Sequence, residues 1–519
     1  MIDEYRCDVV VVGGSLVGSS AAMFLAQQGL SVCLVERRMT VSPHPRARGI
    51  SARTMELFRA AGIESEIRQA GEDDFRFVLG ETLAGAYQHV ARPDAEVMGR
   101  LSPTTPYSCD QNKVEPILRR RAEALGAELW NGSVANEIEQ HSSGVSLLVA
   151  PASAPDHASP PRRIAARYLV AADGANSPLR TSLGVGQHGR DVPGIGISVL
   201  FDADLDGALR GRHVSALVSS RHGAILFPKG KVREHNWFGL APREGLDAVD
   251  ADDIDAIATS AIRATFGNPN LAVTLRSVLT WKTGAYVADR YRSGRVFFVG
   301  DAAHMMPPYG GFGGNTGIAD AHNLAWKLAA VCKAEAPESL LDTYEQERQP
   351  IAEFTVNEVV RRGFGFQPAP TNSPNSALNP AQISLGYCYP LDGSTTAERP
   401  VRDPSQEAGT PGMRAPHVRL RGSVSSTLDL LDPCGFTILT MDGSPFASAP
   451  HSKSVPGVRI PVVRKADVAD LVAWNRAFGN ASGGLLIRPD GVVGWRSDGI
   501  PPDPSAAVSS ARARCLAPI

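Results

Sequence analysis

The sequence predicts an α/β protein with more than one domain, and three observations support this prediction. The chain has 519 residues, which corresponds to roughly two to four domains of ordinary size. A valine-rich run at 7–12 is followed by a glycine-rich turn, a helical pattern and a second apolar run at 30–35, as in a βαβ unit. Proline-rich stretches at 367–381 and 400–416 separate a C-terminal portion from the rest of the chain.

The composition is that of an ordinary globular protein and excludes several classes of function. Lys and Arg total 52, Asp and Glu total 54, and the formal net charge is -2, so no overall field favours nucleic acid or an anionic membrane. No apolar run reaches membrane-spanning length, and the charged N-terminal residues are unlike a signal peptide. We therefore expect a cytoplasmic protein that binds neither nucleic acid nor membranes.

The spacing of cysteines and histidines gives no sign of a metal site. The seven cysteines are scattered and no two have C-x-x-C spacing, which excludes a zinc ribbon and a dithiol redox motif. The histidines are not paired with acids or cysteines at ligand spacing. We expect no bound metal, and scattered thiols fit a reducing compartment.

The turn at 13–18 has most features of a dinucleotide-binding turn. It follows the first predicted strand, precedes a helix predicted at 19–28, and carries glycines at the first and last positions of the usual G-x-G-x-x-G pattern. Ser15 replaces the middle glycine, although its hydroxyl is small and able to donate to a phosphate. Glu36 ends the second strand, 18 residues after Gly18, where an acidic residue accepts from a ribose hydroxyl.

Two further motifs lie far from this turn. Asp173 begins the sequence Asp-Gly-Ala-Asn-Ser-Pro-Leu-Arg directly after an apolar strand. Asp301 stands in Gly-Asp-Ala-Ala-His and is followed by two prolines and the run Gly-Gly-Phe-Gly-Gly-Asn at 310–315. With the first turn, these motifs resemble those of the class A flavoprotein aromatic hydroxylases. In that family the Gly-Asp aspartate binds the ribityl chain of FAD, and the Asp-Gly motif serves both FAD and NAD(P)H.

The resemblance extends over nearly the whole chain and is closest to the aromatic polyketide hydroxylases of the tetracenomycin and aklavinone type. The segment 45–57 is similar to the one beside the flavin in those enzymes. Gln111 stands where the family has a glutamine on the ribityl chain, and 320–328 with 344–348 match the long helix and its exit.

The resemblance implies a Rossmann-like FAD domain of the para-hydroxybenzoate hydroxylase type, an inserted sheet-rich substrate domain and a thioredoxin-like C-terminal domain. We expect the discontinuous FAD domain at 1–178 and 290–385, the substrate domain at 179–289 and the C-terminal domain at 400–519. The last lacks C-x-x-C, so we expect a structural or dimer-forming role, in a monomer or homodimer, and no dithiol exchange.

The resemblance also implies a monooxygenase with non-covalent FAD and with NADPH or NADH as electron donor. It would use O2 to hydroxylate a polycyclic aromatic polyketide through a flavin C4a-hydroperoxide. Only one dinucleotide fingerprint is present, so NAD(P)H is expected to bind without a Rossmann fold of its own. Two alternatives stay open. One is Baeyer–Villiger oxygenation of a polyketide at the same FAD site, and the other is a non-catalytic protein that binds flavin and polyketide.

The expected site residues lie mainly in these motifs. Those expected to bind cofactor are Gly13, Gly14, Ser15, Val17, Gly18, Glu36, Arg37, Arg46, Gln111, Val134, Asp173, Asp301, Gly313, Gly314 and Asn315. The glycine-rich run leads into a helix whose N-terminal amides and positive dipole end suit the negative charge of reduced flavin. Arg46 and Pro308 are the catalytic candidates. Arg46 is expected at the flavin ring or at anionic intermediates, a role that Arg48 fits equally well, and Pro308 is expected to border the flavin.

Two further expectations rest on weaker patterns. His304, close to Asp301, is better explained as a structural residue than as a general base. The residues that could line an apolar substrate slot are Phe227, Pro228, Trp237 and Phe238, which fall on the predicted substrate-domain sheet. Ordinary core packing explains each of these four residues equally well.

Overall fold

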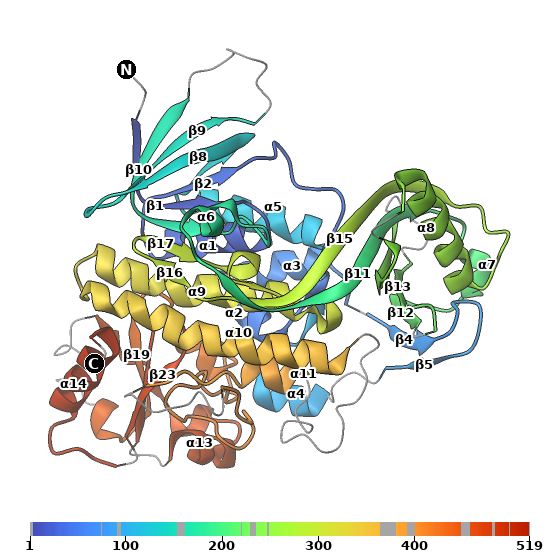
Figure 1. Ribbon diagram of the computed structural model, residues 1–519. Coiled ribbons are helices and arrows are strands. Elements are labelled where there is room, and N and C mark those ends of the chain that lie inside the picture. The colour runs from blue at the N-terminus through green and yellow to red at the C-terminus, as the bar shows by residue number, and fades with distance from the viewer. Residues whose placement is uncertain are drawn as a thin grey trace.

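The computed structural model describes residues 4–73, 75–90, 95–152, 161–219, 221–228, 235–246, 249–363, 380–391, 400–447, 457–479, 483–497 and 499–517. These residues form three regions, each built on its own large sheet (Figure 1). The predicted linker at 367–381 lies outside the described residues except for its last two positions.

The first region contains an eight-stranded sheet with the predicted βαβ unit at its centre. β1 (Glu4–Val12) pairs in parallel with β2 (Val32–Glu36) on one side and with β10 (Arg162–Ala171) on the other. Helix α1 (Leu16–Gln27) joins β1 to β2. The valines at 9–11 are completely buried, because a central parallel strand is covered on both faces.

The other strands complete the sheet on both sides of this unit. They are β7 (Glu128–Asn131), β8 (Ser133–Gln140), β9 (Val145–Pro151), β16 (Arg292–Ser293) and β17 (Val296–Phe298), and the main path runs β16-β17-β10-β1-β2-β7. β1 starts earlier than the valine run because its pairing with β10 begins at Glu4, opposite Arg163. Apolar periodicity does not reveal such a paired but polar start.

Two long helices pack beneath the first sheet. α9 (Phe312–Cys332) and α10 (Thr343–Arg362) run side by side there, and α1 contacts α9 (Figure 1). The shorter helices are α2 (Ala52–Ala60), α3 (Glu64–Ala70), α4 (Ala95–Leu101), α5 (Gln111–Ala124), α6 (Pro178–Ser182) and α11 (Pro380–Leu385), and β3 (Gly49–Ile50) with β6 (Tyr107–Ser108) forms a small ribbon. Within the described residues, none of the helices combines the length and apolar character needed to cross a bilayer.

The second region is a sheet that extends away from the first on two long strands. β11 (Gln187–Asp202) and β15 (Thr274–Ala288) pair along most of their length and carry the chain outward (Figure 1). The sheet continues with β14 (Asn236–Arg243), β13 (Ala224–Phe227) and β12 (Ala216–Ser219), and α8 (Ala251–Phe266) covers one face while α7 (Asp206–Leu209) lies near its end. The sheet-rich pattern predicted for this stretch is therefore present.

The second sheet also takes strands from outside the predicted 179–289 segment. β4 (Phe77–Gly80) pairs in parallel with β12 and antiparallel with β5 (Tyr87–His89). At the other edge β18 (His304–Met305) pairs with β15. The residues at 77–89, which the predicted bounds assign to the FAD domain, thus belong to this sheet, because an added strand pairs the exposed edge of β12.

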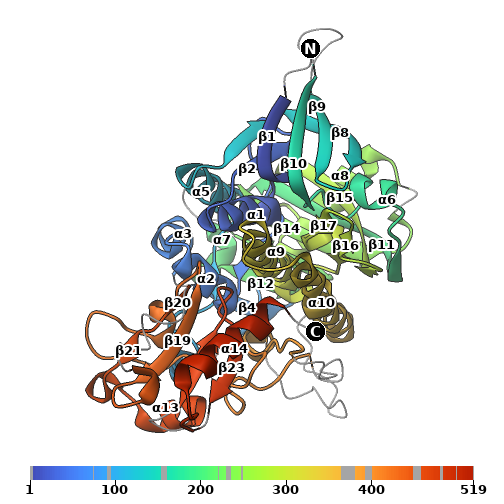
Figure 2. The ribbon, with the colours of Figure 1, turned by 90° about the vertical axis from the view of Figure 1, so that its left-hand side faces the viewer.

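The third region is a mixed five-stranded sheet with helices, as expected for a thioredoxin-like domain. Its elements are β19 (Phe436–Met441), β20 (Val458–Arg459), β21 (Val462–Val463), β22 (Gly484–Ile487), β23 (Val493–Ser497), α13 (Leu471–Phe478) and α14 (Pro504–Leu516). Figures 1 and 2 place it below α9 and α10. Buried ion pairs fix it there: Arg488 binds Glu347 on α10 at 2.7 Å, and Arg414 binds Glu56 on α2 at 2.9 Å.

Candidate active site

One large cavity connects the first sheet with the second. Its volume is about 2350 Å³, more than twice the roughly 1,000 Å³ at the upper end for a site that holds one drug-sized ligand. At its nucleotide end it is lined by residues 12, 13, 15–18, 35–38, 172–176, 178, 179 and Asp301. At its aromatic end it is lined by side chains of the second sheet, including Ser198, Ile225, Phe227 and Trp237. The cavity therefore has room for two ligands that meet between these ends.

The turn at the nucleotide end requires glycine for steric reasons. Gly13 has φ +98°, and a Cβ added there would lie 2.3 Å from the carbonyl oxygen of Ala172. A Cβ on Gly18 would lie 1.7 Å from the oxygen of Gly13. Since no side chain fits at either position, the two glycines let the main chain of the turn lie directly against the strand ends and the cavity.

Glu36 holds the same turn from the side of β2. Its carboxylate accepts a hydrogen bond from the main-chain N–H of Gly14 at 2.6 Å and another from that of Arg38 at 2.9 Å. An ionised carboxylate can accept about four hydrogen bonds, so Glu36 retains capacity for a hydroxyl group in the cavity. Gly14 itself does not line the cavity, because its N–H is turned toward Glu36.

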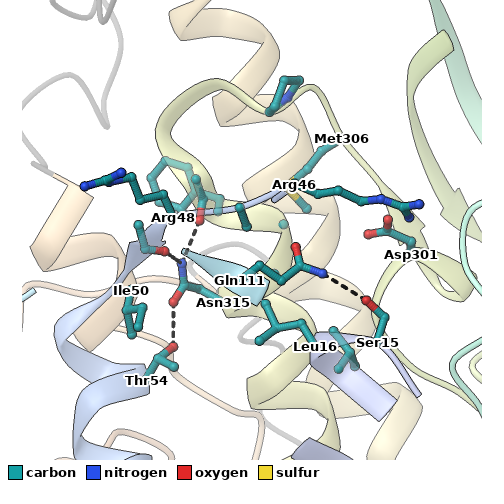
Figure 3. A pocket seen from close by; sticks show the side chains of 18 of the residues that line it. Ser15, Leu16, Arg46, Arg48, Ile50, Thr54, Gln111, Asp301, Met306 and Asn315 are labelled. Atoms are coloured by element: carbon teal, nitrogen blue, oxygen red, sulfur yellow. Dashed lines mark hydrogen bonds between the residues drawn. The ribbon is translucent and has the colours of Figure 1, made fainter. Parts of the chain in front are cut away.

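Ser15, which replaces the middle glycine of the motif, belongs to a polar cluster with two residues of α5. Gln111 Nε2 donates to Ser15 Oγ at 2.9 Å and to Glu115 at 2.7 Å, and Ser15 Oγ donates to Glu115 at 2.7 Å (Figure 3). Within the described residues the amide oxygen of Gln111 accepts no hydrogen bond, and it is free to accept from a ligand. The sequence does not indicate the role of Glu115, since it lies in mid-helix among charged residues.

The Asp-Gly and Gly-Asp motifs lie against each other. Asp173 accepts from Ser177 Oγ at 2.6 Å and from the N–H of Leu179 at 3.1 Å, and so holds the N-terminus of α6, which Ser177 caps. Arg180 then donates to the main-chain oxygen of Ala302 at 2.9 Å, next to Asp301. Burial raises the pKa of Asp173, although these hydrogen bonds oppose the shift.

The side chain of Asp301 is exposed to the cavity, and protein surrounds it on the other sides. Desolvation by this surrounding protein raises the pKa of its carboxyl group, while the charges of His304 and Arg46 lower it. Figure 3 shows the guanidinium of Arg46 reaching toward this carboxylate. A carboxylate on the cavity wall is accessible to a ligand hydroxyl, and a hydrogen bond from that hydroxyl would favour its charged form.

The environments of Arg46 and Arg48 are opposite, although only one residue separates them. Arg48 is buried, binds Asp110 at 3.0 Å and Glu72 at 2.5 Å, and lies 5.4 Å from the ring of Phe227. The guanidinium of Arg46 has no ion pair or hydrogen bond within the described residues, and burial and the charge of Arg38 lower its pKa. Of the two, Arg46 is therefore the arginine that is available to a bound anion.

The N-terminus of α9 is fixed beside the cavity by Asn315. Its side-chain nitrogen donates to the main-chain oxygens of Gly49 at 3.0 Å and Gly311 at 2.6 Å. Its side-chain oxygen accepts from Ser51 N–H at 2.9 Å and from Thr54 Oγ1 at 2.7 Å (Figure 3). The first turn of α9 therefore keeps a constant position, with its free amides and positive dipole end close to the cavity.

His304 is part of the core and does not line the cavity. Its Nε2 lies 2.7 Å from Asp320, which also accepts from Arg348 at 2.8 Å and from the N–H of Gly300 at 3.2 Å. These contacts hold the Gly-Asp loop against α9. The structure thus gives His304 a structural role, as the sequence favours.

The aromatic end corrects part of the predicted substrate slot. Phe227 and Trp237 line the cavity and are stacked, with ring centroids 4.6 Å apart and planes 14° from parallel. Phe238 is completely buried in the core between the second sheet and α8, and Pro228 does not line the cavity. Neighbours in a strand point to opposite faces, so Trp237 and Phe238 cannot share one slot.

Nearly all the predicted cofactor residues surround this one cavity. Each of them except Gly14 lines it, including Val17, Arg37 and Val134, and so does Pro308, a catalytic candidate. The sequence reasoning missed His44 and Ser198, which line it as well. Strict alternation along β11 could have indicated Ser198, but a lone histidine between prolines carries no such signal. Among the described residues, no group of three His, Cys, Asp or Glu side chains is arranged to hold a metal ion.

Comparison with known proteins agrees with this architecture. The sequence matches the FAD binding domain family over residues 6–359 and the C-terminal domain of aromatic-ring hydroxylases over residues 408–518. The chain belongs to the FAD binding domain family and has the domain composition of an aromatic-ring hydroxylase.

Individual relatives show which aromatic-ring hydroxylases this chain resembles. The chain is 37% identical to a putative polyketide hydroxylase of Streptomyces halstedii, over 95% of this chain and 94% of the relative. It is 36% identical to a 4-methyl-5-nitrocatechol 5-monooxygenase of a Burkholderia species, over 98% and 97%. The crystal structure of aklavinone-11 hydroxylase with FAD and aklavinone is similar with a TM-score of 0.87, at 31% identity over 99% of this chain and 100% of that one.

These findings confirm the predicted fold class and the prediction of an FAD-dependent enzyme related to the polyketide hydroxylases. The geometry of the nucleotide end fits FAD. The glycine turn leaves no room for side chains, Glu36 and Gln111 retain acceptor capacity, and the N-terminus of α9 faces the cavity.

Proposed function

We propose that the protein is a monooxygenase that uses NADPH or NADH, FAD and O2 to hydroxylate a polycyclic aromatic phenol of the polyketide class. One observation carries the proposal: a single cavity joins a dinucleotide turn to an apolar wall of stacked aromatic side chains. A cofactor bound at one end and a flat substrate at the other would meet beneath Arg46, Pro308 and the first turn of α9.

The residues proposed to hold FAD are those of the nucleotide end. Glu36 would accept from the ribose, the main chain at 13–18 would face the pyrophosphate, and Gln111 and Asp301 would hold the ribityl chain. Bound FAD would supply the redox chemistry of the reaction, namely acceptance of a hydride from NAD(P)H and activation of O2. We propose that the N-terminus of α9 and the unpaired Arg46 stabilise the negative charge that develops on reduction.

The chain's own contribution at the aromatic end is to orient the substrate and exclude water. Flat apolar side chains favour a fused-ring ligand, because stacking and burial supply affinity without polar partners. The name of one relative refers to a single-ring nitrocatechol, and those of two others refer to a polyketide and to aklavinone. The volume of the cavity, about 2350 Å³, leaves room for a large ligand beside the cofactor and so supports the polycyclic class.

A panel of phenols tests this proposal. The FAD-loaded protein would be given NADPH, O2 and either tri- or tetracyclic hydroxyquinones or simple phenols and catechols, and NADPH consumption would be compared with oxygenated product. We expect tight coupling with at least one polycycle, and NMR of the product to show a ring hydroxyl and no ester from Baeyer–Villiger oxygenation. Tight coupling with a single-ring phenol alone would show that the substrate class is wrong. Release of every bound compound unchanged would favour a non-catalytic binding protein.

A further inference from the structure

A chain of hydrogen bonds joins the segment after β2 to the wall of the aromatic end. His44 lies in this segment and is 4% exposed. Its Nδ1 lies 3.0 Å from Ser277 Oγ on β15, and its Nε2 lies 2.8 Å from Ser198 Oγ on β11. Trp237 Nε1 on β14 lies 2.8 Å from the same Ser198 oxygen. Side chains from three strands of the second sheet are thus connected to the first region through one histidine.

The inventory of donors and acceptors fixes the direction of one bond in this network. The indole N–H of Trp237 can only donate, so Ser198 Oγ accepts from it. Ser198 Oγ also lies within hydrogen-bond distance of Nε2 of His44, its other side-chain partner within the described residues. Because a serine hydroxyl both donates and accepts, Ser198 and Ser277 can partner the two imidazole nitrogens whichever nitrogen carries the hydrogen.

The imidazole of His44 is neutral in this network. Burial lowers its pKa to about 4, and the positive charge of Arg46 acts in the same direction. The ring is therefore neutral at pH 7, with one nitrogen that donates and one that accepts, and each nitrogen has a serine partner. Connected hydrogen bonds of this kind strengthen one another.

Because of these hydrogen bonds, Trp237 can present only its aromatic ring to a ligand. Its single donor is consumed inside the sheet, and the ring is stacked on Phe227 with centroids 4.6 Å apart. The two rings form one flat apolar surface on the cavity. Because an indole can turn about its side-chain bonds, the hydrogen bond to Ser198 sets the orientation of this surface.

We propose that His44 and Ser198 are positioning residues that fix the Trp237 ring and thereby define the surface that selects flat aromatic substrates. The inference rests on the proposed function, since it assigns substrate selection to the aromatic end. Selection by this surface depends on the shape of the ring system, because the fixed indole offers no hydrogen-bond donor to the ligand.

A cycle of single and double variants tests the inference on the FAD-loaded protein. The probe is 1,8-dihydroxyanthraquinone. Its binding is measured by quenching of the flavin fluorescence, without turnover. Ser198→Ala removes the acceptor and Trp237→Phe removes the donor while keeping an aromatic ring. We expect each to weaken probe binding about threefold to tenfold. In the Trp237→Phe background, Ser198→Ala should have no further effect, because the two residues act through one hydrogen bond.

His44 is tested in the same assay. His44→Ala should weaken probe binding as Ser198→Ala does, and His44→Asn, which keeps an acceptor and a donor, should restore part of the affinity. Restoration by the conservative variant separates positioning from a loss of packing. Flavin content should stay at the wild-type level in each variant.

Ser219→Ala is the matched control. Ser219 lies on β12 of the same sheet, is completely buried, and donates to the main-chain oxygen of Glu81 at 2.7 Å, but it does not line the cavity. Its loss should leave probe binding unchanged. Additive effects of Ser198→Ala and Trp237→Phe, equal loss in Ser219→Ala, or failure of the wild-type protein to bind the probe would each overturn the inference. A wild-type protein that binds the probe but oxygenates no phenol contradicts the proposed function alone.

Discussion

The two ends of the cavity are built from different parts of the chain. At the nucleotide end much of the wall is formed by two main-chain turns: the turn at 13–18, which Glu36 holds by a hydrogen bond, and the Asp-Gly motif, which Asp173 holds through Ser177. At the aromatic end the wall is side chains on one face of a sheet, where Phe227 and Trp237 stack and Ser198 lies beside them. Main-chain geometry restricts which residues are allowed, whereas a sheet face accepts many side chains of similar volume.

This difference between the two ends determines which substitutions can change the substrate preference of such an enzyme. Substitutions on the sheet face alter the slot without altering the turns that we propose hold FAD. Substitutions in the glycine turn disturb strand packing and cofactor site together, because the same atoms serve both. We therefore expect variants at the nucleotide end to lose flavin, and variants at the aromatic end to lose affinity for substrate while remaining yellow.

Replacement of Arg48 and of Arg46 by alanine gives the largest expected difference in stability between two variants. Arg48→Ala removes the arginine that pairs with the buried carboxylate of Asp110 and the half-buried carboxylate of Glu72, which should lower the free energy of unfolding by about 3–5 kcal/mol. Arg46→Ala removes a guanidinium without a partner in the described part of the chain, so stability should change by no more than about 0.5 kcal/mol. Denaturant unfolding measures both, and flavin reduction by NADPH should be slower in Arg46→Ala alone. Equal destabilisation by the two variants would contradict the assignment.

Gly13→Ala tests whether main-chain geometry defines the nucleotide end. The added methyl group would lie 2.3 Å from the oxygen of Ala172, at a φ of +98° that alanine avoids. We expect a loss of about 1–3 kcal/mol in stability and purified protein with little flavin. Gly207→Ala is the control, since a Cβ there meets nothing within 4 Å. The ratio of flavin to protein absorbance reports the outcome, and a fully yellow Gly13→Ala protein would refute the steric argument.

Asp301→Ala should separate cofactor binding from stability. A charged hydrogen bond is worth about 1.5–3 kcal/mol, so its loss should weaken FAD binding roughly tenfold to a hundredfold. The stability of the apo protein should change little, because the side chain of Asp301 is exposed to the cavity. Titration of apo protein with FAD and thermal unfolding give the two quantities. A mutant that binds FAD as tightly as wild type would remove Asp301 from the cofactor site.

How far the sequence alone predicts this protein depends on the same difference between the ends. The glycine turn, Glu36 and Asp301 follow strands in a fixed order, so their places at the carboxyl ends of a parallel sheet could be predicted. The strand partners of the second sheet could not: β4 joins β12 across more than a hundred residues of chain, and no local pattern encodes that pairing. The contact of Ser198 with His44 depends on this long-range assembly, and His44 was therefore missed.

The smallest expected effect distinguishes two phenylalanines on opposite faces of the second sheet. Phe227 is stacked on Trp237 in the cavity wall, whereas Phe238 is completely buried against α8. Phe238→Leu should lower the free energy of unfolding by about 1 kcal/mol and leave the KM for substrate unchanged, because its ring does not reach the cavity. Phe227→Leu removes a stacking interaction worth about 0.5–1.5 kcal/mol, so KM for a polycyclic substrate should rise by up to about tenfold with flavin content unchanged. Each variant serves as the control for the other, since both exchange the same ring for the same aliphatic side chain in one sheet. If Phe238→Leu raises KM as much as Phe227→Leu, the alternation of the strand does not define the slot, and the aromatic end is not a surface that can change independently of the core.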